Sequence, residues 1–141
     1  MNEVVVTGGS KAEKEIVEKA VYWCIKKLLP RVRTLDIEVS IRKLNVYGYC
    51  LEGDNNRHFE LEIKKGLSLY DLISTVCHEM VHVKQYAKRE MSFDYDSGRT
   101  RWKAKLIADS VKYEDQPWEK EAFKLEEDLA LQCFKEIKVS V

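Results

Sequence analysis

The stretch from His78 to His82 constrains the fold more than any other, because it reads His-Glu-Met-Val-His inside a long helical pattern. Apolar residues recur at intervals of three and four along one side, which predicts an amphipathic helix over about residues 69–88. Histidines four residues apart share a helix face. The face opposite the apolar side carries Asp71, Thr75, His78, His82 and Gln85, with Glu79 at its border. A histidine that packs in a core belongs on the apolar side, so these two need another partner.

Two imidazoles at this spacing, with a carboxylate beside them, are what a hydrolytic zinc site requires. His78 and His82 would bind one Zn²⁺ ion, and Glu79 would act as the general base toward a zinc-activated water. Catalytic zinc takes three protein ligands, so one more donor must come from elsewhere. The only other histidine, His58, lies upstream on a predicted strand. The four cysteines are scattered without a Cys-x-x-Cys pair, which favours buried thiols over a cysteine site.

A carboxylate from the last predicted helix is the natural third ligand. That helix begins at Pro117 and is expected to run to about Lys138. Glu119 falls on its inward arc among apolar side chains, and a buried carboxylate is costly unless it is paired or binds a metal. We therefore predict Glu119 as the third ligand. Glu121, at the outer edge, and Glu126, two turns further along, stay open as replacements, and Glu126 is also a candidate partner for a ligand histidine or a plain surface charge.

Upstream of this site the chain alternates between helical and strand patterns. Residues 1–10 are an extended start or a loose terminus, and about 11–29 form an amphipathic helix. Alternating apolar and polar residues predict strands at 35–42, 46–51 and 58–64. Short connections favour antiparallel neighbours, so we expect a three-stranded antiparallel meander. The expected class is α+β, with an N-terminal helix, this sheet, the motif helix and a C-terminal ligand helix.

Residues 90–112 are less regular and suggest a loop followed by a strand or hairpin. Its basic residues Arg99, Arg101, Lys103 and Lys105 alternate with uncharged ones. A solvated edge strand and the recognition of an acidic partner both explain this stripe. Lys and Arg together number 24, as do Asp and Glu, so the net charge is zero and a nucleic-acid partner is not expected.

Length and hydropathy indicate how many domains the chain forms and whether it is expected to enter a membrane. Its 141 residues suit a single domain, residues 1–141, with a modest core. The apolar runs are far shorter than a membrane span, and the start of the chain lacks the basic and apolar regions of a signal peptide. We therefore expect a cytoplasmic protein without a membrane partner. The oligomeric state is not indicated.

The motif, followed by Glu119-Lys120-Glu121-Ala122, resembles the zincin metallopeptidases of the gluzincin kind. In that family a Glu-x-x-Ala segment on a second helix supplies the third zinc ligand, so the resemblance also implies Glu119. The expected order of elements matches a minimal zincin-like domain. The chain also resembles short metallopeptidase-like proteins of phages and bacteria, including ImmA/IrrE-like and SprT-like proteins, which implies a bacterial cytoplasm or a phage gene. SprT-like members use a downstream histidine as third ligand, and no histidine follows His82 here.

The function that follows is a zinc-dependent metalloprotease acting on a peptide or protein substrate. Tyr113, just before the ligand helix, and Tyr86, one turn past His82, are candidates for steadying the oxyanion. The strand from His58 to Lys64 is expected to be an edge that pairs with extended substrate. The alternative is a binding or regulatory module that keeps the zincin-like shell without turnover.

Overall fold

Four strands form a mixed sheet in the order β1-β2-β4-β3. The computed structural model describes residues 1–137. Strands β1 (Glu3–Gly8) and β2 (Asp36–Arg42) are parallel, and β2 is also parallel to β4 (His58–Lys64). Strand β3 (Gly48–Glu52) runs antiparallel to β4 at the edge of the sheet.

The predicted three-stranded antiparallel meander is therefore wrong, although all three of its strands form. The chain after β2 passes the position that β4 later fills and places β3 outside it, so β2 and β3 are not neighbours. Ile37, Val39 and Ile41 of β2 are at most 2% exposed, as expected for a central strand, and β1 and β4 pair with its two sides. Strand β4 is also interior, so the prediction that His58 to Lys64 form a substrate-binding edge is wrong as well.

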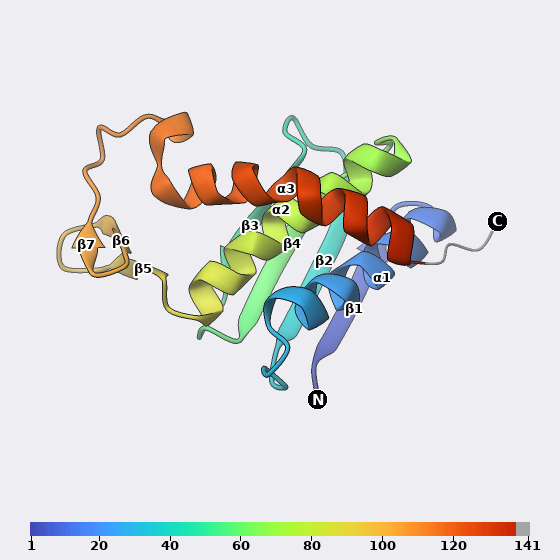
Figure 1. Ribbon diagram of the computed structural model, residues 1–141, viewed down its shortest axis with the longest axis horizontal. Helices are drawn as coiled ribbons and strands as arrows, with labels where there is room; N and C mark the ends of the chain where they lie inside the picture. Colours follow the sequence, from blue (N-terminus) through green and yellow to red (C-terminus); the bar gives the residue numbers. More distant parts are fainter. Residues whose placement is uncertain (138–141) are drawn as a thin grey trace.

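Three long helices cover one face of the sheet. Helices α1 (Lys11–Leu28) and α2 (Leu69–Ala87) pack on the strands, and α3 (Pro117–Glu136) lies across α2 (Figure 1). These bounds agree with the predicted helices, and the α+β class is confirmed. The predicted end of the last helix at Lys138 lies outside the described residues.

The N-termini of α1 and α2 are capped as their sequences indicate. The Ser10 hydroxyl accepts the Glu13 N–H, and the Glu13 carboxylate accepts the Ser10 N–H, which is a capping box. The Ser68 hydroxyl likewise accepts the Asp71 N–H at the start of α2. The second Glu13 oxygen accepts the Gly66 N–H at 2.9 Å and ties α1 to the turn before α2.

Helix α2 is buried on both sides, because the sheet covers its apolar face and α3 covers the opposite one. The polar residues of that second face are therefore at most 6% exposed, namely Thr75, His78, His82 and Gln85. The sequence predicted that these histidines point away from the sheet, and α3 is the element they face. The predicted arrangement of the two faces is confirmed.

A small antiparallel sheet follows α2 and projects from one end of the domain (Figure 1). It consists of β5 (Met91–Asp94), β6 (Arg99–Trp102) and β7 (Lys105–Leu106), with Lys103 and Ala104 at positive φ in the last turn. The basic stripe lies here, and Arg99 and Arg101 face Asp109 and Asp94 at 3.9 and 3.7 Å.

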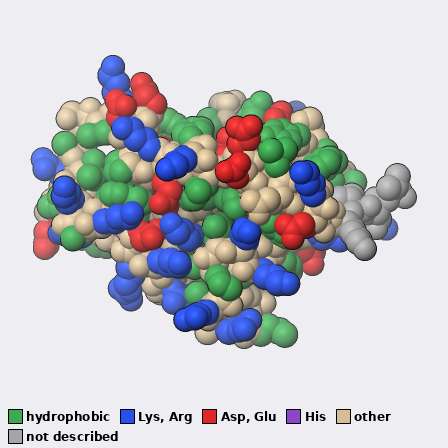
Figure 2. All heavy atoms as spheres, viewed as in Figure 1, with side chains coloured by type: hydrophobic (Ala, Val, Ile, Leu, Met, Phe, Trp, Pro, Cys, Tyr) green, Lys and Arg blue, Asp and Glu red, His purple; other side chains and the backbone are tan. Residues whose placement is uncertain are grey.

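Lys and Arg side chains are scattered over the face shown in Figure 2, with Asp and Glu side chains among them. Within residues 1–137, none of the helices has both the length and the apolar character needed to cross a membrane.

Candidate metal centre

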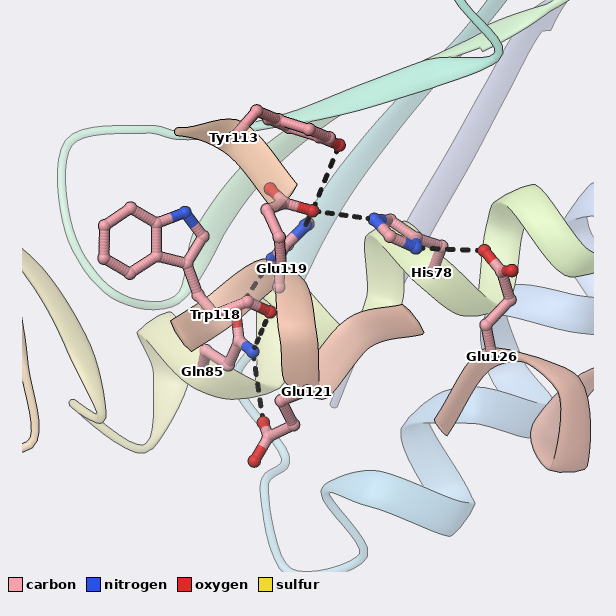
Figure 3. Close-up of polar contacts among 8 residues, drawn as sticks. His78, Gln85, Tyr113, Trp118, Glu119, Glu121 and Glu126 are labelled. Atoms are coloured by element: carbon pink, nitrogen blue, oxygen red, sulfur yellow. Dashed lines mark hydrogen bonds and ion pairs between the residues drawn. The ribbon is translucent and has the colours of Figure 1, made fainter. Parts of the chain in front are cut away.

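Glu119, in the first turn of α3, meets both histidines of α2. Its Oε1 atom lies 3.0 Å from His78 Nε2 and 3.2 Å from His82 Nε2. All three residues are at most 8% exposed, and one ligand atom from each lies within 4.8 Å of the others. Figure 3 shows the Glu119 carboxylate between Tyr113 and His78. The fold thus brings together the three residues predicted as metal ligands.

The opposite ring nitrogens face acceptors too. His78 Nδ1 lies 3.0 Å from Glu126 Oε1, and His82 Nδ1 lies 2.8 Å from Gln85 Oε1. A neutral imidazole has one N–H and one lone pair, so it cannot donate to both acceptors. A cation at the Nε2 side, either a proton or a metal ion, removes the conflict. Two imidazoles and a carboxylate are a zinc donor set, so these residues fit a Zn²⁺ ion.

The electrostatic interactions within the trio of His78, His82 and Glu119 favour the charged form of each of these side chains. Burial alone would lower the pKa of His78 and of His82, but the hydrogen bonds to Glu119 and the negative charges of Glu119 and Glu79 together outweigh it and raise both pKa values. Burial alone would likewise raise the pKa of Glu119, yet the hydrogen bonds from His78 and His82, together with the charges of these two histidines, lower it to about 2. The centre therefore keeps an anionic carboxylate that needs cationic charge beside it.

Glu79 lies next to the trio without belonging to it. Glu79 is 5% exposed, and it lines the same cleft as the two histidines. Burial raises the pKa of Glu79 to about 7, although the charges of His82 and His78 act in the opposite direction. A carboxyl group with such a pKa can both take up and release a proton near neutral pH.

Two adjoining hollows open over the site, with cavity volumes of about 360 and 260 Å³. The five residues that line both of them are Val46, Gly48, His78, Glu79 and Tyr113. The larger hollow extends to Tyr86, Met91 and Trp118, and the smaller one to Tyr47 and Phe123. Strand β3 and the segment before it form one wall, in place of the predicted β4.

The two tyrosines predicted to steady an oxyanion both line the larger hollow. Tyr113 lies in a single 3₁₀ turn before α3, and its hydroxyl donates to Glu119 Oε1 at 3.2 Å. The Tyr86 ring packs near Phe59, with 6.1 Å between ring centroids. Burial raises the pKa of both tyrosines to about 12, so each keeps its hydroxyl proton at neutral pH. Tyr113 is the one whose hydroxyl reaches the trio.

The remaining candidates have other partners. Glu121 Oε1 accepts from Lys84 Nζ at 2.9 Å and from Gln85 Nε2 at 3.1 Å, and Glu126 contacts the outer nitrogen of His78. Neither takes the position of Glu119. His58 Nε2 lies 3.3 Å from Glu38 Oε2, and its neighbours in β4 are paired with β2 on the sheet.

Sequence reasoning missed the role of two features. Gln85 was placed on the histidine face, but its position three residues after His82 was not recognised as a signal for a side-chain contact. The second feature is Gly48, where a Cβ would lie 2.7 Å from Glu62 O and 3.0 Å from Thr75 Cγ2. Because glycine has no Cβ, the edge strand can lie this close to α2 beside the cleft.

Scans against protein-family models, curated proteins and solved structures found no match to this chain. The likeness to zincins therefore rests on the two motifs alone. The geometry of the site does not depend on this likeness. Two histidines from α2 and a glutamate from α3 converge in a buried position beside a cleft.

Proposed function

We propose that this chain is a zinc-dependent metallopeptidase with a minimal zincin-like site. The observation that carries the proposal is the contact of Glu119 Oε1 with the Nε2 atoms of both His78 and His82. These three residues would hold one Zn²⁺ ion. A bound zinc would supply Lewis acidity, which polarises a peptide carbonyl and makes a water nucleophilic near neutral pH.

Two residues beside the trio then have separate roles in amide hydrolysis, one in proton transfer and one in stabilising negative charge. The Glu79 carboxylate takes one proton from the attacking water and passes it to the nitrogen of the leaving amine. The Tyr113 hydroxyl donates a hydrogen bond to the carbonyl oxygen as negative charge develops on it. Its contact with Glu119 places this hydroxyl at the trio before substrate arrives.

The cleft favours an extended peptide with apolar side chains on both sides of the bond that is cut. Tyr86, Met91 and Trp118 line one hollow, and Tyr47 and Phe123 line the other. Among the described residues, neither hollow is lined by a Lys or Arg that could bind a terminal carboxylate. The cleft therefore supports cleavage within a chain better than removal of a C-terminal residue.

Replacement of Glu79 by Gln tests the catalytic part of this proposal. Zinc-loaded wild-type protein and Glu79→Gln would be incubated with a peptide library, and products would be identified by mass spectrometry. We expect Glu79→Gln to keep its zinc and to lose on the order of 10²- to 10⁴-fold in cleavage rate, the usual share of general acid–base catalysis.

The matched control is Glu60→Gln, the same chemical change on an exposed strand position, which should cleave like wild type. Zinc-loaded wild-type protein that cleaves no peptide would contradict the peptidase assignment. Biological activity that survives Glu79→Gln would instead favour a module that binds without turnover.

A further inference from the structure

Gln85 is a fully buried polar side chain whose presence the three candidate ligands do not explain. It lies in α2, one turn after His82 and on the same face, with no exposed surface. Burying an amide is costly unless its donors and its acceptor are all paired. Three contacts satisfy Gln85, and two of them come from α3.

The contacts from α3 fix which way the amide points. Gln85 Nε2 lies 3.0 Å from the carbonyl oxygen of Trp118 and 3.1 Å from Glu121 Oε1 (Figure 3). Both partners are acceptors, so the NH₂ group must face them. A flipped amide would place its oxygen against both acceptors and lose two hydrogen bonds. The carbonyl oxygen of Gln85 therefore faces His82 Nδ1, at 2.8 Å.

This orientation determines how His82 can bind a cation. An amide oxygen only accepts, so the Nδ1 atom of His82 is the nitrogen that carries a proton toward Gln85. The ring then presents Nε2 toward Glu119. Outer hydrogen bonds of this kind orient ligand histidines and raise their basicity.

We propose that Gln85 is a positioning residue that holds the His82 ring with Nδ1–H toward its own oxygen and Nε2 toward the zinc position. The inference rests on the metal site of the proposed function. Because Trp118 precedes Glu119 directly, the same amide aligns the His82 ring with the helix turn that carries the third ligand. Gln85 thus links the geometry of two ligands from two helices.

A purely structural role would have a different signature. If Gln85 only joined α2 to α3, its loss would lower stability and leave the zinc affinity and the His82 ring unchanged. Lys84 already joins the same helices through Glu121, at 2.9 Å, without touching a ligand. The ring and the metal affinity are therefore the informative readouts.

The main variant is Gln85→Met, which keeps a long side chain and removes its hydrogen bonds. In zinc-loaded, ¹⁵N-labelled protein, NMR reports the Nδ1–H of each ligand histidine. We expect the His82 Nδ1–H signal to exchange faster with solvent in Gln85→Met, because its acceptor is gone. The His78 Nδ1–H faces Glu126 and should be unchanged, which makes it an internal reference. Chelator competition should show zinc binding weaker by on the order of 10- to 100-fold.

Two further variants separate positioning from folding. Gln85→Glu keeps an acceptor for Nδ1–H, so the protected signal and the zinc affinity should return even if stability falls. Val83→Ala removes buried volume from the same helix and should lower stability without changing either readout. Wild-type zinc affinity and an unchanged His82 signal in Gln85→Met would overturn the role of Gln85. Absence of zinc binding in the wild type would instead overturn the metal site itself, and the inference with it.

Discussion

Removal of Glu119 should destabilise the metal-free protein and abolish its response to zinc. In the metal-free state Glu119 accepts from His78 Nε2, His82 Nε2 and the Tyr113 hydroxyl. Two hydrogen bonds to charged partners contribute about 3–6 kcal/mol together. The cost of burying the carboxylate offsets part of this, so Glu119→Ala should lower the free energy of unfolding by about 2–4 kcal/mol.

Zinc should widen this difference. A ligand that binds only the native state adds about 4 kcal/mol of stability at a thousandfold excess over its Kd, which raises Tm by roughly 10–15 °C in a chain of this size. Wild-type protein should show this rise, and Glu119→Ala should show little of it because one of three ligands is missing.

Urea unfolding in chelator and thermal unfolding with added zinc measure the two effects. Glu127→Ala is the matched control, since Glu127 is an exposed carboxylate on the same helix and its loss should stay within about 0.5 kcal/mol. The reasoning would be refuted if Glu119→Ala were as stable as this control in chelator, or if zinc stabilised Glu119→Ala as much as wild type.

Further predictions concern the cleft, the edge strand and the helix cap. Tyr113→Phe should keep zinc affinity within a small factor and reduce kcat by on the order of 10²-fold, whereas Tyr86→Phe should change kcat little; steady-state kinetics with a cleaved peptide distinguish them. Gly48→Ala should lower the free energy of unfolding by about 1–3 kcal/mol in urea titrations, because the new Cβ would meet the Glu62 carbonyl. Hydrogen bonds from the Gly66 and Ser10 N–H groups lower the pKa of Glu13, so its contribution to stability is present above the ordinary value of 4.5 and is lost as pH falls through the lower folded value. Urea midpoints of Glu13→Gln should therefore fall less steeply below pH 4.5 than those of wild type, and parallel curves would contradict this.

The elements and the ligand trio followed from local patterns. The period of the apolar residues identified α1, α2 and α3, because each helix carries an apolar stripe, and Pro117 marked the start of α3. Glu119 could be selected because an inward glutamate in the first turn of a helix needs a cationic partner. The histidines could be separated from the core because they lie opposite the apolar stripe of α2.

Strand order could not be predicted in the same way. The alternation in β2 and β4 fixes which side chains face the helices, but it is equally compatible with parallel and antiparallel neighbours. Strand β1 lies in the stretch predicted as an extended start or a loose terminus, because a run of valines does not indicate which strand it pairs with. Gln85 was placed on the right face, yet its two hydrogen bonds to α3 depend on how α3 crosses α2, which no local pattern encodes.

The most direct test of the metal centre is anomalous diffraction at the zinc absorption edge from crystals grown with zinc. The proposed site predicts one strong anomalous peak per chain, bounded by His78 Nε2, His82 Nε2 and the carboxylate of Glu119. The same crystals of Glu119→Ala should show a weakened peak or none. Wild-type crystals without a peak at this position, or with zinc bound only elsewhere, would contradict the account.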